Sequence, residues 1–159
     1  MIRSSIFRSK ISKLFLQGQD AFQLDKYEEA ARIFSTVIDK IPPIWQNEFP
    51  EYVDSVLYMS SLQRIVGKPL EAEKYLDLAF HLIPDESQQA IIWHMYAGDI
   101  YTDLGRYKEA EEKYLVVYKF FTDAGMNNHD MFKTLCHNMH TLYIQMGQFE
   151  LAQEYLGKS

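Results

Sequence analysis

The chain contains little cysteine and few basic residues, and it has no long apolar run. Its 159 residues include one cysteine, Cys136, so no internal disulfide can form and we expect a reducing, cytoplasmic location. No run of 18 apolar residues occurs, which predicts no membrane span. The net charge is −6. An acidic chain repels a phosphate backbone, so we expect no nucleic-acid partner, whereas a basic protein partner is compatible.

The N-terminus departs from this acidic balance. Residues 1–13 have no acid and carry four basic residues: Arg3, Arg8, Lys10 and Lys13. A targeting segment or a membrane-touching helix would have this composition. We favour the interpretation that Ile11, Leu14 and Phe15, which have helical spacing, begin the first helix of the domain. An apolar core with a cleavage site is lacking, so we expect no secretory signal.

Four similar phrases recur along the chain. They are Lys26-Tyr27-Glu28-Glu29-Ala30, Lys68-Pro69-Leu70-Glu71-Ala72, Arg106-Tyr107-Lys108-Glu109-Ala110 and Gln148-Phe149-Glu150-Leu151-Ala152. Successive alanines of these phrases are 42, 38 and 42 residues apart, as their numbers show. A fixed phrase at a nearly fixed period indicates one structural unit used repeatedly.

Each phrase follows a turn signal and opens a helix. Glycine supplies the left-handed residue in three turns, at Gly67, Gly105 and Gly147, and Asp25 takes that place in the first. Asp85 or Ser87 is a candidate N-cap for the helix after the second repeat. Apolar residues are spaced three, four and seven apart, which predicts helices. The expected helices span 11–24, 27–41, 50–66, 69–83, 87–104, 107–123, 129–146 and 148–157.

This pattern resembles the tetratricopeptide repeat. The residues that match its large, small and aromatic positions include Leu14, Gly18, Tyr27, Ala30 and Phe34 in the first unit, Met59, Ser60, Ala72 and Leu76 in the second, Gly98, Tyr101, Tyr107, Ala110 and Tyr114 in the third, and Met139, Tyr143, Phe149, Ala152 and Leu156 in the fourth. Small residues there let paired helices approach closely, and large residues fill the gaps between pairs.

The resemblance implies an all-α fold, a right-handed superhelical α-solenoid of about four antiparallel helix pairs. We expect a basic extension over 1–10 and a single domain over 11–159, with repeats at about 11–44, 53–86, 91–124 and 133–159. The usual repeat has 34 residues, and the longer units here resemble those of kinesin light chains.

The family resemblance also implies a concave groove lined by the first helix of each pair. Mapping it onto this chain gives ten candidate partner-binding residues: Phe15, Gln19, Leu57, Tyr58, Arg64, Met95, Tyr96, Asp99, His137 and Asn138. Tyr58 and Tyr96 would anchor a partner, since aromatic residues lead in such contacts. A register shift of one residue would instead place some of these side chains in the core.

The chaperone-binding members of the family hold a carboxylate with Lys, Arg and Asn. The positions that would match carry Phe15, Gln19, Tyr58, Ile92 and Tyr96, so we expect no carboxylate clamp.

Other chemistry has weak support. Cys136, His137 and His140 lie within five residues and could share a metal, but core and groove packing explains them better, and we expect no metal. Gly157-Lys158-Ser159 resembles the end of a phosphate-binding loop, but Ala152 stands where the first glycine belongs. We expect no cofactor and no enzymatic activity.

The sequence therefore predicts a protein-interaction module that binds a peptide or helix of a partner. Two alternatives stay open. Leu151 and Tyr155 would face outward on the last helix, where the chain either continues in a longer protein or pairs with a second copy as an assembly scaffold. The groove could also serve as a sensor for a peptide or small ligand.

Overall fold

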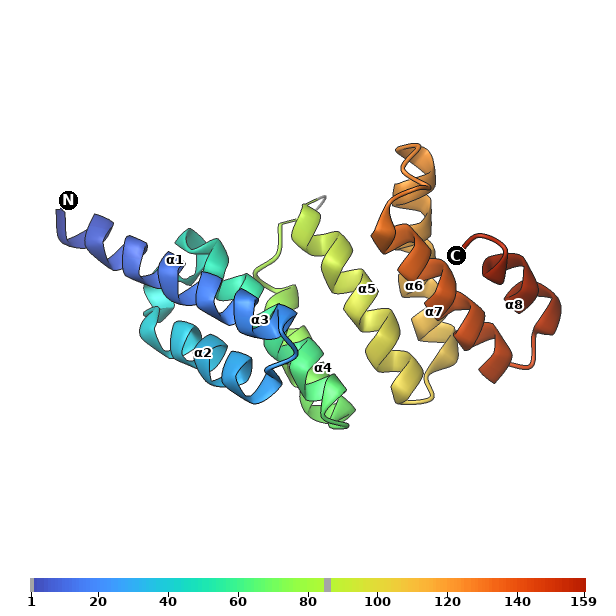
Figure 1. The fold of residues 1–159 in the computed structure, drawn as a ribbon, viewed down its shortest axis with the longest axis horizontal. Helices are drawn as coiled ribbons and strands as arrows, with labels where there is room; N and C mark the ends of the chain where they lie inside the picture. Colours follow the sequence, from blue (N-terminus) through green and yellow to red (C-terminus); the bar gives the residue numbers. More distant parts are fainter. Residues whose placement is uncertain (1, 85–86) are drawn as a thin grey trace. The chain divides into compact units, whose positions relative to one another are not determined.

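The chain is a succession of α-helices, which the computed structural model describes for residues 2–84 and 87–159. The elements are α1 (Ile2–Gln23), α2 (Tyr27–Lys40), the 3₁₀ helix η1 (Pro43–Glu48), α3 (Pro50–Ile65), α4 (Pro69–Phe80), α5 (Gln88–Asp103), α6 (Tyr107–Asp123), α7 (Asp130–Gln145) and α8 (Phe149–Leu156). Consecutive α-helices pack in pairs, α1 on α2, α3 on α4, α5 on α6 and α7 on α8 (Figure 1). The pairs form two compact units, Met1–Ile83 and Pro84–Ser159.

One left-handed residue ends the first helix of each pair. The backbone φ angle is 57° at Asp25, 76° at Gly67, 72° at Gly105 and 71° at Gly147. The following amide then donates back to the last turn of the helix, with Lys26 N 2.9 Å from Ala21 O in the first pair. This geometry gives hydrogen-bond partners to carbonyls that would otherwise have none. It also confirms the prediction that Asp25 takes the left-handed place that glycine has in the other turns.

Two features near the start of the chain differ from the expectation. The predicted start of the first helix at residue 11 is wrong, because α1 begins at Ile2 and includes most of the basic segment. The segment 2–10 has no glycine or proline to stop a helix, and Phe7 of that segment packs on Phe49, with ring centroids 5.7 Å apart. The 3₁₀ helix after Pro42 was also not expected.

The N-cap of α5 is Ser87. Its hydroxyl accepts a hydrogen bond from the Ala90 amide at 3.1 Å, which is the usual geometry of a serine cap. Asp85, the alternative, lies outside the described residues.

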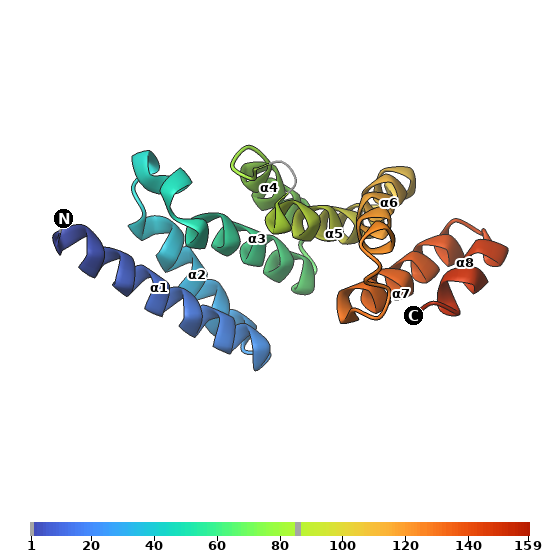
Figure 2. The same ribbon diagram turned by 90° about the horizontal axis from the view of Figure 1, so that it is seen from above.

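The two units repeat each other at an offset of 80 residues. The four motif alanines show this offset, since Ala110 and Ala152 follow Ala30 and Ala72 by 80 positions. The left-handed turn residues of the two units are separated by the same 80 positions. Figure 2 allows α1 to α4 and α5 to α8 to be followed separately. We call residues n and n + 80 equivalent below.

Within each unit the two helix pairs are packed differently. In the first pair of each unit a glycine faces an aromatic ring: a Cβ on Gly18 would lie 2.7 Å from Phe34 Cε1, and one on Gly98 would lie 2.3 Å from Tyr114 Cε1. The second pair has Ser60 or His140 at that position. Ser60 Oγ donates to Ala72 O at 3.0 Å, and His140 Nδ1 lies 2.8 Å from the equivalent carbonyl of Ala152.

Candidate partner-binding surface

In the first unit, a hydrogen bond joins the first helices of successive pairs. Gln19 Nε2 on α1 donates to Tyr58 Oη on α3 at 3.2 Å. The Tyr58 ring is stacked on Phe34, with centroids 4.5 Å apart and planes at 6°, and Phe22 meets its edge at 5.0 Å. The ring is therefore fixed on an aromatic bed, while Tyr58 and Gln19 both stay partly exposed.

The other candidates of the first unit fall into two groups. Phe15 and Leu57 are buried, at 8% and 2% exposed, so they support the surface from below. Arg64 is partly exposed in the last turn of α3. Gln19, Tyr58 and Arg64 are thus the candidates of this unit that a partner could reach.

In the second unit, a carboxylate stands at the equivalent place. Asn138 Nδ2 on α7 donates to Asp99 Oδ1 on α5 at 2.8 Å, and Tyr114 Oη on α6 donates to the same oxygen at 2.6 Å. Asp99 is equivalent to Gln19, and Asn138 to Tyr58. Three helices therefore meet at one half-buried acceptor, and hydrogen bonds to a charged acceptor are stronger than those between neutral groups.

The remaining candidates of the second unit lie on α5 and α7, the helices that carry Asp99 and Asn138. Met95 is 5% exposed and belongs to the core. Tyr96 is partly exposed on α5, and His137 is exposed on α7 beside Asn138. Asp99, Asn138, Tyr96 and His137 are therefore the reachable candidates here.

Sequence reasoning missed Tyr114 as the residue that orients Asp99. The signal was present, because Gly98 leaves room for a ring and Tyr114 lies four residues after the motif alanine Ala110. Phe34 occupies the equivalent position in the first unit, where it has no hydroxyl to donate.

The cysteine and histidines of α7 do not come together as a metal site. Cys136 is fully buried, and burial raises the pKa of its thiol. The rings of His137 and His140 are 6.5 Å apart, and His140 Nδ1 contacts the Ala152 carbonyl. Within the described residues, no group of three or more His, Cys, Asp or Glu side chains could hold a metal ion.

Of the two residues expected to face outward on the last helix, Leu151 is exposed and Tyr155 is not. Tyr155 is 8% exposed, because it stacks on Tyr143 at 5.4 Å and meets the Tyr118 ring edge-on at 5.5 Å. Burial also raises the pKa of its phenol. The exposed apolar side chains of α8 are Phe149, Leu151 and Leu156, at 66%, 39% and 42%.

The comparisons with known proteins agree with this architecture. The family profile described as tetratricopeptide repeat matches residues 90–115, the region of α5 and the start of α6. No curated protein matches the sequence. In the described ranges 2–84 and 87–159, no helix is long and apolar enough to cross a membrane.

Solved structures share the fold. A protein from Podosopora anserina described as a kinesin light chain with nearly identical TPR-like repeats matches in its Q17M form with a TM-score of 0.77 at 17% identity, over 95% of this chain and 73% of that one. A second structure of the Podosopora anserina protein matches with a TM-score of 0.74 at 18% identity, over 95% of this chain and 74% of that one. BtubC (BKLC) from P. vanneervenii matches with a TM-score of 0.55 at 19% identity, over 93% of this chain and 55% of that chain.

The helix pairs and their packing define an all-α protein of tetratricopeptide-like helix pairs. The predicted resemblance is confirmed: the tetratricopeptide repeat model matches residues 90–115, and the fold is like that of the TPR-like repeats in the Podosopora anserina structures. Tetratricopeptide repeats generally mediate protein–protein interaction.

Proposed function

We propose that this protein binds a segment of a partner protein on the inner-helix surfaces, meaning the faces formed by α1 and α3 in the first unit and by α5 and α7 in the second. One observation carries the proposal. In both units a hydrogen bond joins successive first helices at equivalent positions, Gln19 to Tyr58 and Asn138 to Asp99. Polar groups held in place and partly exposed offer hydrogen bonds to a partner at a low cost in conformational entropy.

The two surfaces favour different partner chemistry. The first offers a tyrosine hydroxyl and an amide beside an aromatic bed, with Arg64 in the last turn of α3, which suits a peptide backbone and its polar side chains. The second presents the Asp99 carboxylate with the Asn138 amide, which suits a basic side chain. A partner segment with a basic residue fits the second surface best.

The test is capture of partners from native lysate with a variant that changes both surfaces without disturbing the core. Gln19→Ala/His137→Ala removes one partly exposed and one exposed side chain. We avoid Tyr58, because its ring stacks on the fully buried Phe34. Gln153→Ala, on the exposed side of α8, is the matched control.

We expect partners that wild type and Gln153→Ala retain and that the double variant loses, with all three proteins folded at the temperature of the capture, as circular dichroism would show. Equal retention by all three would remove both surfaces from consideration as the binding site.

A second candidate function is self-association through α8. It is favoured by Phe149, Leu151 and Leu156, three exposed apolar side chains on one helix of eight residues. Light scattering should then give a mass that rises with concentration, and Leu151→Asp should abolish the rise. Gln153→Asp places the same charge elsewhere on α8 and should not. A constant monomer mass for wild type would contradict the idea.

A further inference from the structure

The second unit contains an apolar pocket with a volume of about 330 Å³. It lies where the start of α5, the end of α6 and the start of α7 meet. Its apolar lining consists of Ile91, Ile92, Phe120, Phe121, Met126 and Met131. An apolar hollow of this size on the surface can bury an apolar group of a ligand or partner.

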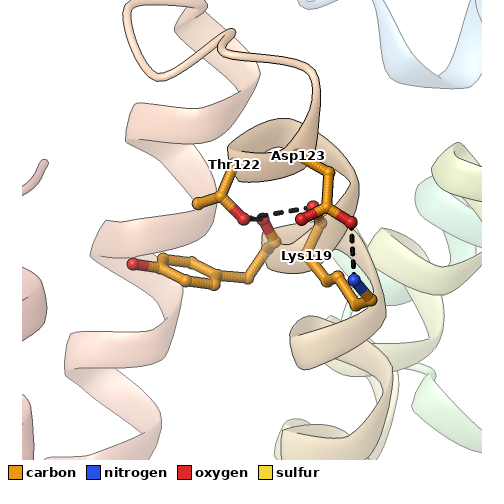
Figure 3. Close-up of polar contacts among 4 residues, drawn as sticks. Lys119, Thr122 and Asp123 are labelled. Atoms are coloured by element: carbon orange, nitrogen blue, oxygen red, sulfur yellow. Dashed lines mark hydrogen bonds and ion pairs between the residues drawn. The ribbon is translucent and has the colours of Figure 1, made fainter.

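The wall formed by the end of α6 has two local polar contacts. Lys119 Nζ lies 2.6 Å from Asp123 Oδ2, and Thr122 Oγ1 donates to Tyr118 O at 3.0 Å (Figure 3). The same turn carries Phe120 and Phe121. The pocket therefore has a helical wall on this side.

The first unit fills the equivalent place with its own aromatic side chains. Phe7 packs against Trp45 and Phe49, with ring centroids 5.6 and 5.7 Å away. Ile11 beneath them is 1% exposed and Phe49 is 4% exposed.

The corresponding residues of the second unit are uncovered. Ile91, equivalent to Ile11, is partly exposed, and His129, equivalent to Phe49, is exposed. Ser87 stands where the first unit has Phe7, so the ring that closes the first unit has no counterpart in the second.

Helix length explains this difference. α1 begins at Ile2, so it has an additional turn that carries Phe7, whereas α5 begins at Gln88, the equivalent of Arg8. The chemistry of the pocket lining differs as well. Ser12 donates a hydrogen bond to Glu51 in the first unit, whereas the equivalent residues of the second unit are the apolar Ile92 and Met131. The second unit thus has an apolar lining where the first has a polar pair.

We propose that this pocket receives a phenylalanine side chain from a partner protein. The first unit supplies the template, since Phe7 fills the same place there. A phenyl ring in the pocket would lie near the Phe121 ring and the thioethers of Met126 and Met131, and both kinds of group make favourable contacts with aromatic rings. This pocket shares α5 and α7 with the second inner-helix surface, but Tyr96, Asp99, His137 and Asn138 do not line it, so its test does not depend on the function of that surface.

Methyl-detected NMR of the whole chain tests the proposal, with N-acetyl-phenylalaninamide as the probe. We expect saturable shifts of the Ile91, Ile92, Met126 and Met131 methyl signals at millimolar probe. N-acetyl-leucinamide should bind at least about twofold more weakly, because it lacks the ring contacts. Equal binding of the two amides, or no shift at these methyls, would overturn the proposal.

Filling the pocket separates binding there from binding elsewhere. Ile92→Trp and Met126→Trp fill it from two different walls, and each should abolish the shifts at the remaining methyls. Leu70→Trp, on the exposed side of α4, is the matched control and should leave them unchanged. Shifts that persist in either folded pocket variant would place the probe elsewhere and overturn the proposal. Tighter binding of toluene than of the capped amino acid would assign the pocket to a small aromatic molecule instead of a partner's side chain.

Discussion

The two units share a backbone plan and differ in the side chains placed on it. Both use Ala, a left-handed turn residue and a glycine-to-ring contact at equivalent positions. At the inner surface, however, the first unit has the neutral pair Gln19 and Tyr58, and the second has the charged Asp99 with Asn138. The comparison teaches that the repeat determines where side chains lie and leaves their chemistry free to vary.

Inside each unit, a second comparison concerns how closely the paired helices approach. A glycine permits an aromatic ring to lie across the first pair, whereas Ser60 and His140 of the second pairs bond to an alanine carbonyl. Leu76 and Leu156 replace the ring in those pairs. Ring and glycine therefore go together, and changing one without the other should be costly.

The largest effect is expected for Gly98→Ala. Its Cβ would lie 2.3 Å from Tyr114 Cε1, and Tyr114 is 1% exposed, so the ring has little room to move. Overpacking of this kind should outweigh the gain in helix propensity and lower the free energy of unfolding by about 2–3 kcal/mol. Gly18→Ala, with 2.7 Å to Phe34, should cost less. Urea unfolding measures both.

A double-mutant cycle provides the control. Gly98→Ala should cost less than about 1 kcal/mol in a Tyr114→Leu background, because leucine removes the clashing ring and imitates the second pairs. An unchanged cost in that background would show that the ring is not the cause.

The next largest effect should come from removing the shared carboxylate. Asp99→Ala takes away the acceptor of Tyr114 Oη and Asn138 Nδ2, and it should lower the free energy of unfolding by about 1.5–2 kcal/mol, since bonds to a charged group are involved. Gln19→Ala removes one neutral bond at the equivalent place and should cost about 0.5–1 kcal/mol. Equal losses would mean that the charge of Asp99 adds nothing to stability.

The fold could be predicted from the sequence because its signals are local. Asp25 could be recognised as a left-handed residue, since the glycines at the other turns fixed the position by analogy. The start of α1 could not be predicted, because nothing in the sequence marks a boundary before residue 11. Phe7 also packs on Phe49, which is 42 positions away in the sequence.

The candidate surface was predicted less well, because burial depends on contacts between helices. The family resemblance placed Gln19, Tyr58, Asp99 and Asn138 among the groove residues, and the structure brings them together in two bonded pairs. The sequence pattern could not show that Leu57 and Met95 are core residues. Neighbouring residues on a helix point about 100° apart, so a shift of one residue exchanges an exposed position for a buried one.

A smaller effect is expected at the second pairs. Ser60 is fully buried, and Ser60→Ala removes its bond to the Ala72 carbonyl, which should lower the free energy of unfolding by about 1 kcal/mol. Ser61→Ala, at a partly exposed neighbour on α3, is the matched control and should change little. A loss as large for Ser61→Ala would show that the effect comes from helix propensity and not from the buried bond.

The smallest effect is expected for the pH dependence of stability. It concerns one position at which the second unit has a histidine and the first has a leucine. His94 of the second unit is equivalent to Leu14 of the first, and its partly buried ring has a pKa below the ordinary value of 6.5, because burial disfavours the charged form and Lys113 repels it. The unfolded chain therefore binds the proton more tightly than the folded chain. The stability that depends on neutral His94 is fully present above pH 6.5 and is lost as the pH falls through the window between 6.5 and the lower folded pKa. His94→Leu imitates the first unit and should lose less stability than wild type between pH 7.5 and 5.5 in urea unfolding. Equal losses in the two proteins would assign the pH dependence to other groups.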